Sequence, residues 1–85
     1  MITVRKPTPE EVLEMQAKPT WSCEASQFKW SYNDSETCLI IKGRVKVTYD
    51  GGSAEFGEGD LVVFAKGLQC EWHVIEDVEK YYKFG

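Results

Sequence analysis

The chain has 85 residues, with ten basic and fourteen acidic side chains and a formal net charge of −4. This length predicts a single domain spanning residues 1–85, and because so small a domain buries only a modest share of its surface, we expect a homodimer. The lack of a basic cluster argues against nucleic acid as a partner. No apolar run reaches the roughly 18 residues of a membrane-spanning helix. The N-terminus also has no apolar leader, so we expect a cytoplasmic protein without a membrane partner.

The first predicted element is a short helix over Pro9–Ala17. Thr8 suits the capping position, Pro9 suits the first helical position, and Glu11 completes a capping box at the positive end of the helix dipole. Pro19 biases the residue before it out of the helical region and so ends the helix. We expect this helix to cover one end of a barrel or sheet.

Beyond Pro19 the hydrophobic period changes from about 3.6 to about 2, which is typical of strands. Asp50-Gly51-Gly52 supplies the positive-φ residues of a hairpin turn between two alternating segments. Seven or eight short strands with one helix predict an all-β fold, a small antiparallel β-barrel or jelly roll. The predicted strands are Trp21–Ala25, Phe28–Tyr32, Glu36–Lys42, Arg44–Tyr49, Ser53–Phe56, Leu61–Phe64, Gln69–Val74 and Val78–Phe84.

Alternation along these strands groups aromatic and reactive side chains, because successive side chains point to opposite faces. Glu36 and Cys38 share one face of their strand, and His73 lies alone on the outer face of another. The remaining grouped residues are Phe28, Trp30 and Tyr32 on one strand and Cys70, Trp72 and Val74 on a second.

Two glycine-anchored segments, 30–43 and 59–70, have a recognisable spacing set by Gly43, Gly59 and Gly67. They resemble the two motifs of the cupin superfamily. Within it, the chain is most similar to the small single-domain cupins grouped with the cupin domain of ureidoglycine aminohydrolase and with ethanolamine-utilisation cupins. The resemblance covers roughly half of the chain. It implies a cupin-like β-barrel, whose usual metal site is three histidines and one glutamate.

The resemblance implies that four residues occupy the metal-ligand slots and converge inside the barrel. They are Trp30, Tyr32, Glu36 and Cys70, and only the glutamate belongs to the usual set, so we expect no metal and no cofactor. An alternative is a soft-metal site of Cys38, Cys70 and Glu36, although zinc requires three or four ligands in a tetrahedral array. The favoured interpretation of both cysteines is that of small buried hydrophobic residues.

Glu36 is the strongest functional candidate. A carboxylate among apolar strand residues must be paired, hydrogen-bonded, metal-bound or protonated. Lys66 is the only cation that we would pair with it. The structural alternative is a glutamate at the barrel rim, hydrogen-bonded to backbone or to Tyr32. A nucleophilic role for Cys70 would need a nearby cation or histidine to stabilise its thiolate, and Glu36 would do the opposite.

These residues favour three functional hypotheses. The first is a protein of unassigned activity that binds a small organic molecule in the barrel. The second is an enzyme acting on an amide or amine, with Glu36 as general acid or base and Tyr32 positioning the substrate. The third is a structural or regulatory interaction module whose own side chains fill the barrel. The predicted ligand-binding residues are Trp30, Tyr32, Glu36, Cys38, Cys70 and Trp72.

Overall fold

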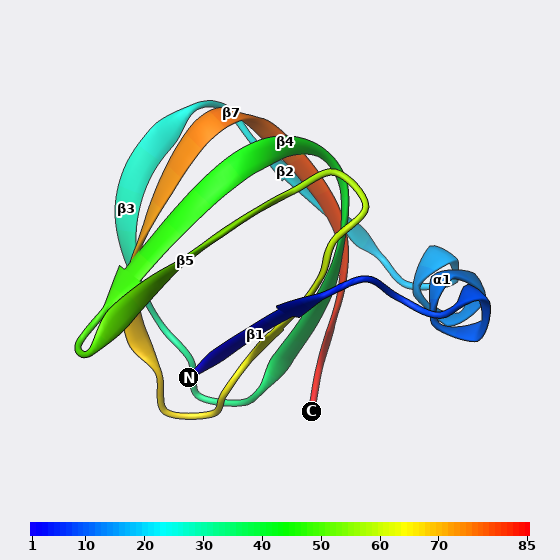
Figure 1. Ribbon diagram of the computed structural model, residues 1–85, viewed down its shortest axis with the longest axis horizontal. Helices are drawn as coiled ribbons and strands as arrows, with labels where there is room; N and C mark the ends of the chain where they lie inside the picture. Colours follow the sequence, from blue (N-terminus) through cyan, green and yellow to red (C-terminus); the bar gives the residue numbers. More distant parts are fainter.

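A computed structural model describes the whole chain, Met1–Gly85, as an antiparallel all-β barrel with one short helix (Figure 1). The prediction of the fold class is therefore confirmed. The elements are β1 (Ile2–Arg5), α1 (Pro9–Gln16), β2 (Thr20–Cys23), β3 (Ser26–Ser31), β4 (Glu36–Tyr49), β5 (Gly52–Gly57), β6 (Leu61–Phe64) and β7 (Gln69–Phe84).

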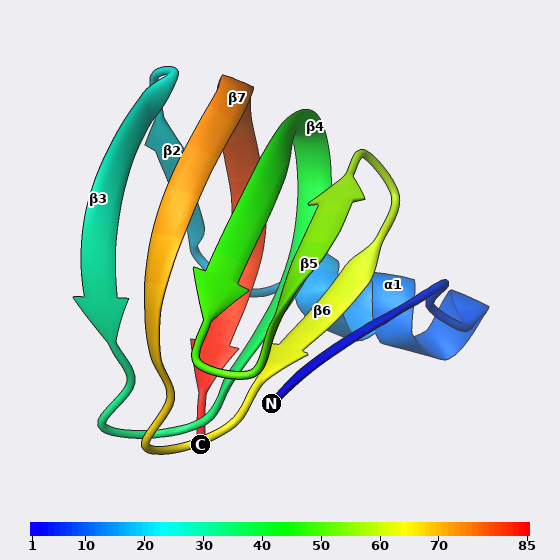
Figure 2. The same ribbon diagram turned by 60° about the vertical axis from the view of Figure 1, so that its left-hand side comes forward.

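Two long bent strands, β4 and β7, run through both layers of the barrel (Figure 2). They pair with each other from Glu36 opposite Phe84 to Tyr49 opposite Cys70. One layer has the order β1-β6-β4-β7-β2, while β5 and β3 flank the other halves of β4 and β7. Residues 36–49 were predicted as two separate strands, and so were residues 69–84. Each range forms one continuous strand, because the chain bends at register shifts without leaving the sheet.

The bend in β4 requires a glycine. Gly43 has a φ of 100°, in the region that L side chains rarely adopt. A Cβ atom there would lie 2.7 Å from the Cα of Val78 and would also collide with the carbonyl oxygen of Asp77. The close approach of β4 and β7 at this corner therefore excludes any side chain.

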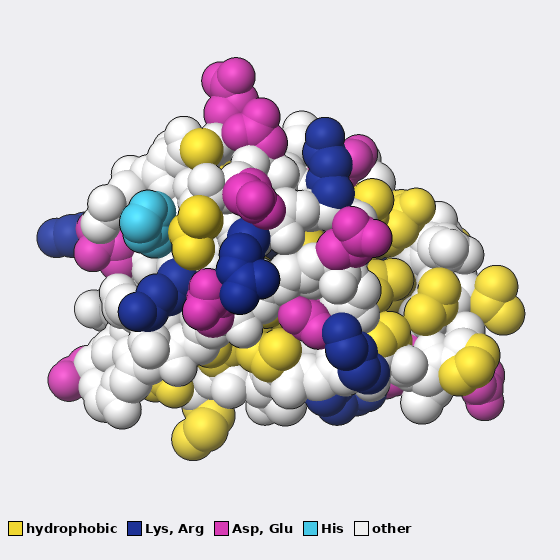
Figure 3. All heavy atoms as spheres, turned by 45° about the horizontal axis from the view of Figure 1, so that its top comes forward, with side chains coloured by type: hydrophobic (Ala, Val, Ile, Leu, Met, Phe, Trp, Pro, Cys, Tyr) yellow, Lys and Arg dark blue, Asp and Glu magenta, His cyan; other side chains and the backbone are white.

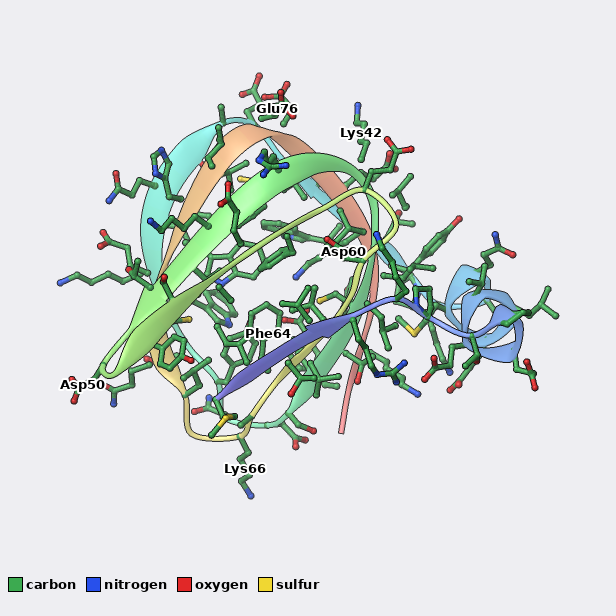
Figure 4. All side chains as sticks on the ribbon, viewed as in Figure 1. Lys42, Asp50, Asp60, Phe64, Lys66 and Glu76 are labelled. Carbon is green, nitrogen blue, oxygen red and sulfur yellow. The ribbon has the colours of Figure 1, made fainter.

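The core lies between the two layers and contains a column of stacked aromatic rings. Phe64, which points into the barrel in Figure 4, stacks on Tyr32 with ring centroids 4.9 Å apart and on Trp72 at 5.5 Å. Phe28 stacks on Trp72 at 5.9 Å. These rings occupy much of the lumen and join strands from both layers.

The helix forms as predicted, but it packs at a different place. The capping box is present: Glu11 N–H donates to Thr8 Oγ1 at 3.2 Å, and Thr8 N–H donates to Glu11 Oε1 at 2.8 Å. Met15 is buried against Leu39 and Leu61, in a small cluster separate from the core between the layers. The helix therefore covers the outer side of the sheet and not an end of the barrel (Figure 1).

The first strand, β1, was not predicted from the sequence. β1 pairs antiparallel with β6 at the edge of the sheet, from Ile2 opposite Phe64 to Arg5 opposite Leu61. The β-branched residues Ile2, Thr3 and Val4 were the available signal.

The single helix is neither long nor apolar enough to cross a membrane. On the face shown in Figure 3, basic and acidic side chains are interspersed and form no patch of one sign.

Candidate functional site

A cavity of about 200 Å³ enters the lumen between β2, β3 and the C-terminal half of β7. Its rim is aromatic: Trp30 and Phe84 are about half exposed, and Trp21 is 37% exposed. The floor is buried and polar. Seven of the nine lining side chains are aromatic, and the full set is Trp21, Phe28, Trp30, Tyr32, Glu36, Trp72, Lys80, Tyr82 and Phe84.

The floor is a hydrogen-bonded group of three side chains centred on Glu36. The Tyr32 hydroxyl donates to Glu36 Oε1 at 2.7 Å, and the Lys80 ammonium donates to Oε2 at 2.9 Å. The side chains of Lys80 and Glu36 are only 6% and 4% exposed. Because both charges are buried and paired, the floor is polar but carries no net charge.

The cation beside Glu36 was predicted wrongly. Lys66 points away from the barrel (Figure 4), whereas Lys80 reaches Glu36 from the inner face of β7. The Lys80 Nζ atom also lies 4.6 Å from the ring centroid of Trp72 and 4.9 Å from that of Trp21. The negative faces of both rings attract the ammonium, so carboxylate and aromatic rings together enclose it.

The second glycine segment holds the first in place. Gly67, with a φ of 87°, donates its N–H to the Tyr32 carbonyl oxygen at 2.7 Å, and the Tyr32 N–H donates to the Leu68 carbonyl oxygen at 2.8 Å. These bonds fix the backbone of Tyr32 beyond the end of β3. Glu36, the first residue of β4, then brings its carboxylate within reach of the Tyr32 hydroxyl.

Burial keeps the hydroxyl and thiols of this region protonated. Burial, followed by the charge of Glu36, raises the pKa of Tyr32 far above its usual range, so its hydroxyl is a donor. Burial also raises the pKa of Cys38 strongly, against an opposing effect of Lys80. Burial raises the pKa of Cys70 as well. Neither thiol is disposed to act as a thiolate.

The structure brings four of the six predicted binding residues to the cavity, namely Trp30, Tyr32, Glu36 and Trp72. Phe28, predicted to share a strand face with Trp30 and Tyr32, also lines the cavity. Cys38 and Cys70 are buried but do not line the cavity. The thiol of Cys70 instead approaches the Trp30 carbonyl oxygen at 3.6 Å, and His73 lies exposed on the outer face as predicted.

The residues present do not fit the metal site that the fold family implies. No three His, Cys, Asp or Glu side chains lie together in an arrangement that could hold a metal ion, so the alternative set of Cys38, Cys70 and Glu36 is not assembled. The Lys80 ammonium already stands beside the carboxylate, and the protonated thiols are poor ligands. Lys80 thus supplies within the chain the positive charge that a metal would bring.

Four lining residues were missed by the sequence reasoning, among them Lys80. The alternation of Val78, Lys80 and Tyr82 on one face of the predicted last strand was a usable signal, because Val78 and Tyr82 mark that face as inward. Charged side chains in strands normally face solvent, which makes a lysine an uncommon candidate for an inward position. The others are Trp21, Tyr82 and Phe84.

Comparisons with known proteins agree with this architecture. Residues 10–82 match the family described as the EutQ-like cupin domain. A DUF861 family protein from Thermotoga maritima is 42% identical, with a TM-score of 0.94 and full coverage of both chains. The EutQ protein of Clostridium difficile is 22% identical, with a TM-score of 0.71 over 76% of this chain and 52% of its own. A putative ethanolamine utilization protein Q from Salmonella typhimurium is 17% identical, with a TM-score of 0.71 over 98% and 68%. A comparison with curated proteins yields no match.

Proposed function

The chain belongs to the EutQ-like cupin family, and we propose that it uses the barrel lumen to bind a small, uncharged, largely apolar organic molecule. A volume of about 200 Å³ is below the range of roughly 300–1,000 Å³ that is common for drug-sized ligands. The ligand is therefore a small one, held between aromatic side chains.

The observation that carries this proposal is a buried ion pair at the bottom of an open cavity. A buried pair such as Glu36 and Lys80 rarely stabilises a fold more than apolar side chains of the same volume would. In a domain of this size, that desolvation cost favours a role beyond packing. Placement at the end of an aromatic cavity supports the role of orienting a ligand.

The chemistry of the floor favours a ligand with a hydrogen-bond acceptor. An ammonium has three N–H donors, and Lys80 makes one hydrogen bond within the protein, to Glu36. A second carboxylate would suffer repulsion from Glu36, whereas a neutral carbonyl oxygen would not. Aromatic walls then favour a flat or apolar body on that carbonyl.

A thermal-shift screen of small neutral aromatic and alicyclic compounds, including benzamide, tests the proposal. A binder raises the melting temperature in proportion to its occupancy of the folded state. The rim variants Trp30→Ala and Phe84→Ala should lose the shift, since both positions are half-exposed and line the cavity. Ile75→Ala, exposed but outside the cavity, is the matched control and should keep it. No shift with any compound, or equal shifts in all variants, would contradict the proposal.

A homodimer in the cytoplasm is a second part of the proposal. The small size of the domain and the exposed apolar side chains of Val4 and Leu13, which lie outside the cavity, support a partner copy. Three unpaired cysteines suit a reducing compartment. Light scattering after gel filtration measures the mass in solution, and a monomer at micromolar concentration would contradict the dimer. Location is tested by fractionating cells that express the protein.

A further inference from the structure

We propose that Lys80 reacts reversibly with a small aldehyde or ketone in the cavity to form an iminium ion, a protonated Schiff base. The inference rests on the proposed function, since the carbonyl compound is a ligand of the same cavity. It adds a covalent step and names the class of molecule that undergoes it.

The first support is the access to Lys80. It is the only lysine buried in the chain, with 5% of its surface exposed, and it lines the cavity. A small molecule in the cavity therefore meets this amine, while bulk solvent hardly does. Lysines desolvated in apolar pockets are the kind that form Schiff bases, because burial favours the neutral, nucleophilic amine.

The second support is a base at hydrogen-bond distance. Glu36 Oε2 lies 2.9 Å from Lys80 Nζ and can accept a proton from the ammonium. The neutral amine then forms a bond to the carbonyl carbon, giving a carbinolamine after proton transfer to its oxygen. Protonated Glu36 returns its proton to the carbinolamine hydroxyl, which leaves as water while the C=N bond forms. Ammonium and carbonyl compound thus give iminium and water, with no change in total charge.

The third support is that the surroundings of the ammonium also suit the product. The iminium carries the same positive charge, and the ring faces of Trp21 and Trp72, at 4.9 and 4.6 Å, attract either cation. Glu36 remains beside it as the counter-ion. The site therefore does not penalise conversion of one cation into the other.

No neighbouring side chain competes with Lys80 as a nucleophile for the carbonyl compound. Tyr32 keeps its proton and donates to the other oxygen of Glu36, which holds the carboxylate in place. The thiols of Cys38 and Cys70 are buried and do not line the cavity. They offer no competing thiolate to the carbonyl carbon.

The test is trapping with benzaldehyde and sodium borohydride, followed by peptide mass mapping of the wild-type protein. Reduction converts the iminium into a stable benzyl-lysine. We expect one benzyl group on Lys80 at aldehyde concentrations that leave Lys83, partly exposed and outside the cavity, unmodified. An excess of benzamide, whose carbonyl does not form imines, should suppress labelling at Lys80. It should leave unchanged the labelling of Lys83 that appears at higher aldehyde concentrations.

Two variants sharpen the result. Lys80→Arg keeps the cation beside Glu36 but cannot form the adduct, so labelling should disappear while the circular dichroism spectrum is retained. Glu36→Gln removes the proton acceptor and should slow labelling at Lys80 at least ~10-fold, as for loss of a general base. Labelling of Lys83 should be the same in both variants.

The outcomes separate the two proposals. Benzyl groups distributed over exposed lysines without preference for Lys80 would overturn the iminium. Lys80 labelling that benzamide does not suppress would contradict the binding of both compounds in one cavity. If benzamide raises the melting temperature and Lys80 is still not trapped, the iminium is wrong and binding stands. If no compound of the neutral screen binds and Lys80 is not trapped, both proposals are wrong.

Discussion

The energetic coupling between Glu36 and Lys80 is the prediction that follows most directly from the structure. The perturbation is a double-mutant cycle made of Glu36→Gln, Lys80→Met and the double variant. Each single change leaves one buried polar group without its partner, whereas the double change removes both charges. We therefore expect the double variant to lose less stability than the sum of the two single losses.

The magnitude follows from the distance and the burial. At 2.9 Å and an effective dielectric constant of about 20, two unit charges attract by about 6 kcal/mol before desolvation is subtracted. Breaking a buried pair by removing one partner costs about 3–5 kcal/mol. We expect Lys80→Met to lose that much free energy of unfolding, with an interaction energy of about 2–3 kcal/mol across the cycle.

Urea denaturation followed by circular dichroism gives the four free energies. The matched control is a second cycle, Glu14→Gln with Lys83→Met, on an ion pair that is exposed although its atoms are closer, at 2.6 Å. Solvent screens that pair, so its coupling should be clearly smaller. Losses at Glu36 and Lys80 that add to within ~0.5 kcal/mol would refute the reasoning, since independent sites behave in that way.

Two further predictions concern the scaffold. Gly43→Ala should lower the free energy of unfolding by about 3 kcal/mol or more, because the new side chain combines a positive φ with a collision against β7. Gly51 has a similar φ but no atom within 4 Å of the position that a Cβ would take, so Gly51→Ala should lower it by only about 1–2 kcal/mol. Equal losses in urea denaturation would contradict the close approach of β4 and β7 at Gly43. The hydrogen bond from Arg5, with that from Thr8, holds the pKa of Glu11 at about 2. A lowered carboxyl pKa stabilises the fold above the ordinary pKa, so the melting temperature of Glu11→Gln should lie below wild type near pH 6 and converge with it as pH falls toward 2. A difference in melting temperature between wild type and Glu11→Gln that does not change with pH would contradict this prediction.

Local signals in the sequence were sufficient for the local structure. Thr8, Pro9 and Glu11 predicted the helix start, and Asp50-Gly51 predicted the hairpin between β4 and β5, because caps and turns depend on a few adjacent residues. The helix packing and the continuity of β4 and β7 depend on distant residues. No local pattern distinguishes a bend within one strand from a turn between two.

The site divides in the same way. The hydrogen bond between Tyr32 and Glu36 joins residues four apart, and it had been named from the sequence as a structural alternative for Glu36. The ion pair joins Glu36 to Lys80 across 44 residues, and its existence depends on the register between β4 and β7. Choosing Lys66 in its place shows that the nature of a partner can be anticipated more readily than its position.

The separation between the bends of β4 and β7 and the floor of the cavity has an evolutionary consequence. Backbone geometry at Gly43 fixes the bend of β4, whereas the polar floor of the cavity consists of side chains, Glu36 and Lys80, that project from continuously paired strands. A lineage can therefore exchange one polar floor for another through a few substitutions without rebuilding the barrel. The same scaffold can therefore carry different sites, and membership of the fold family alone does not identify what binds in the barrel.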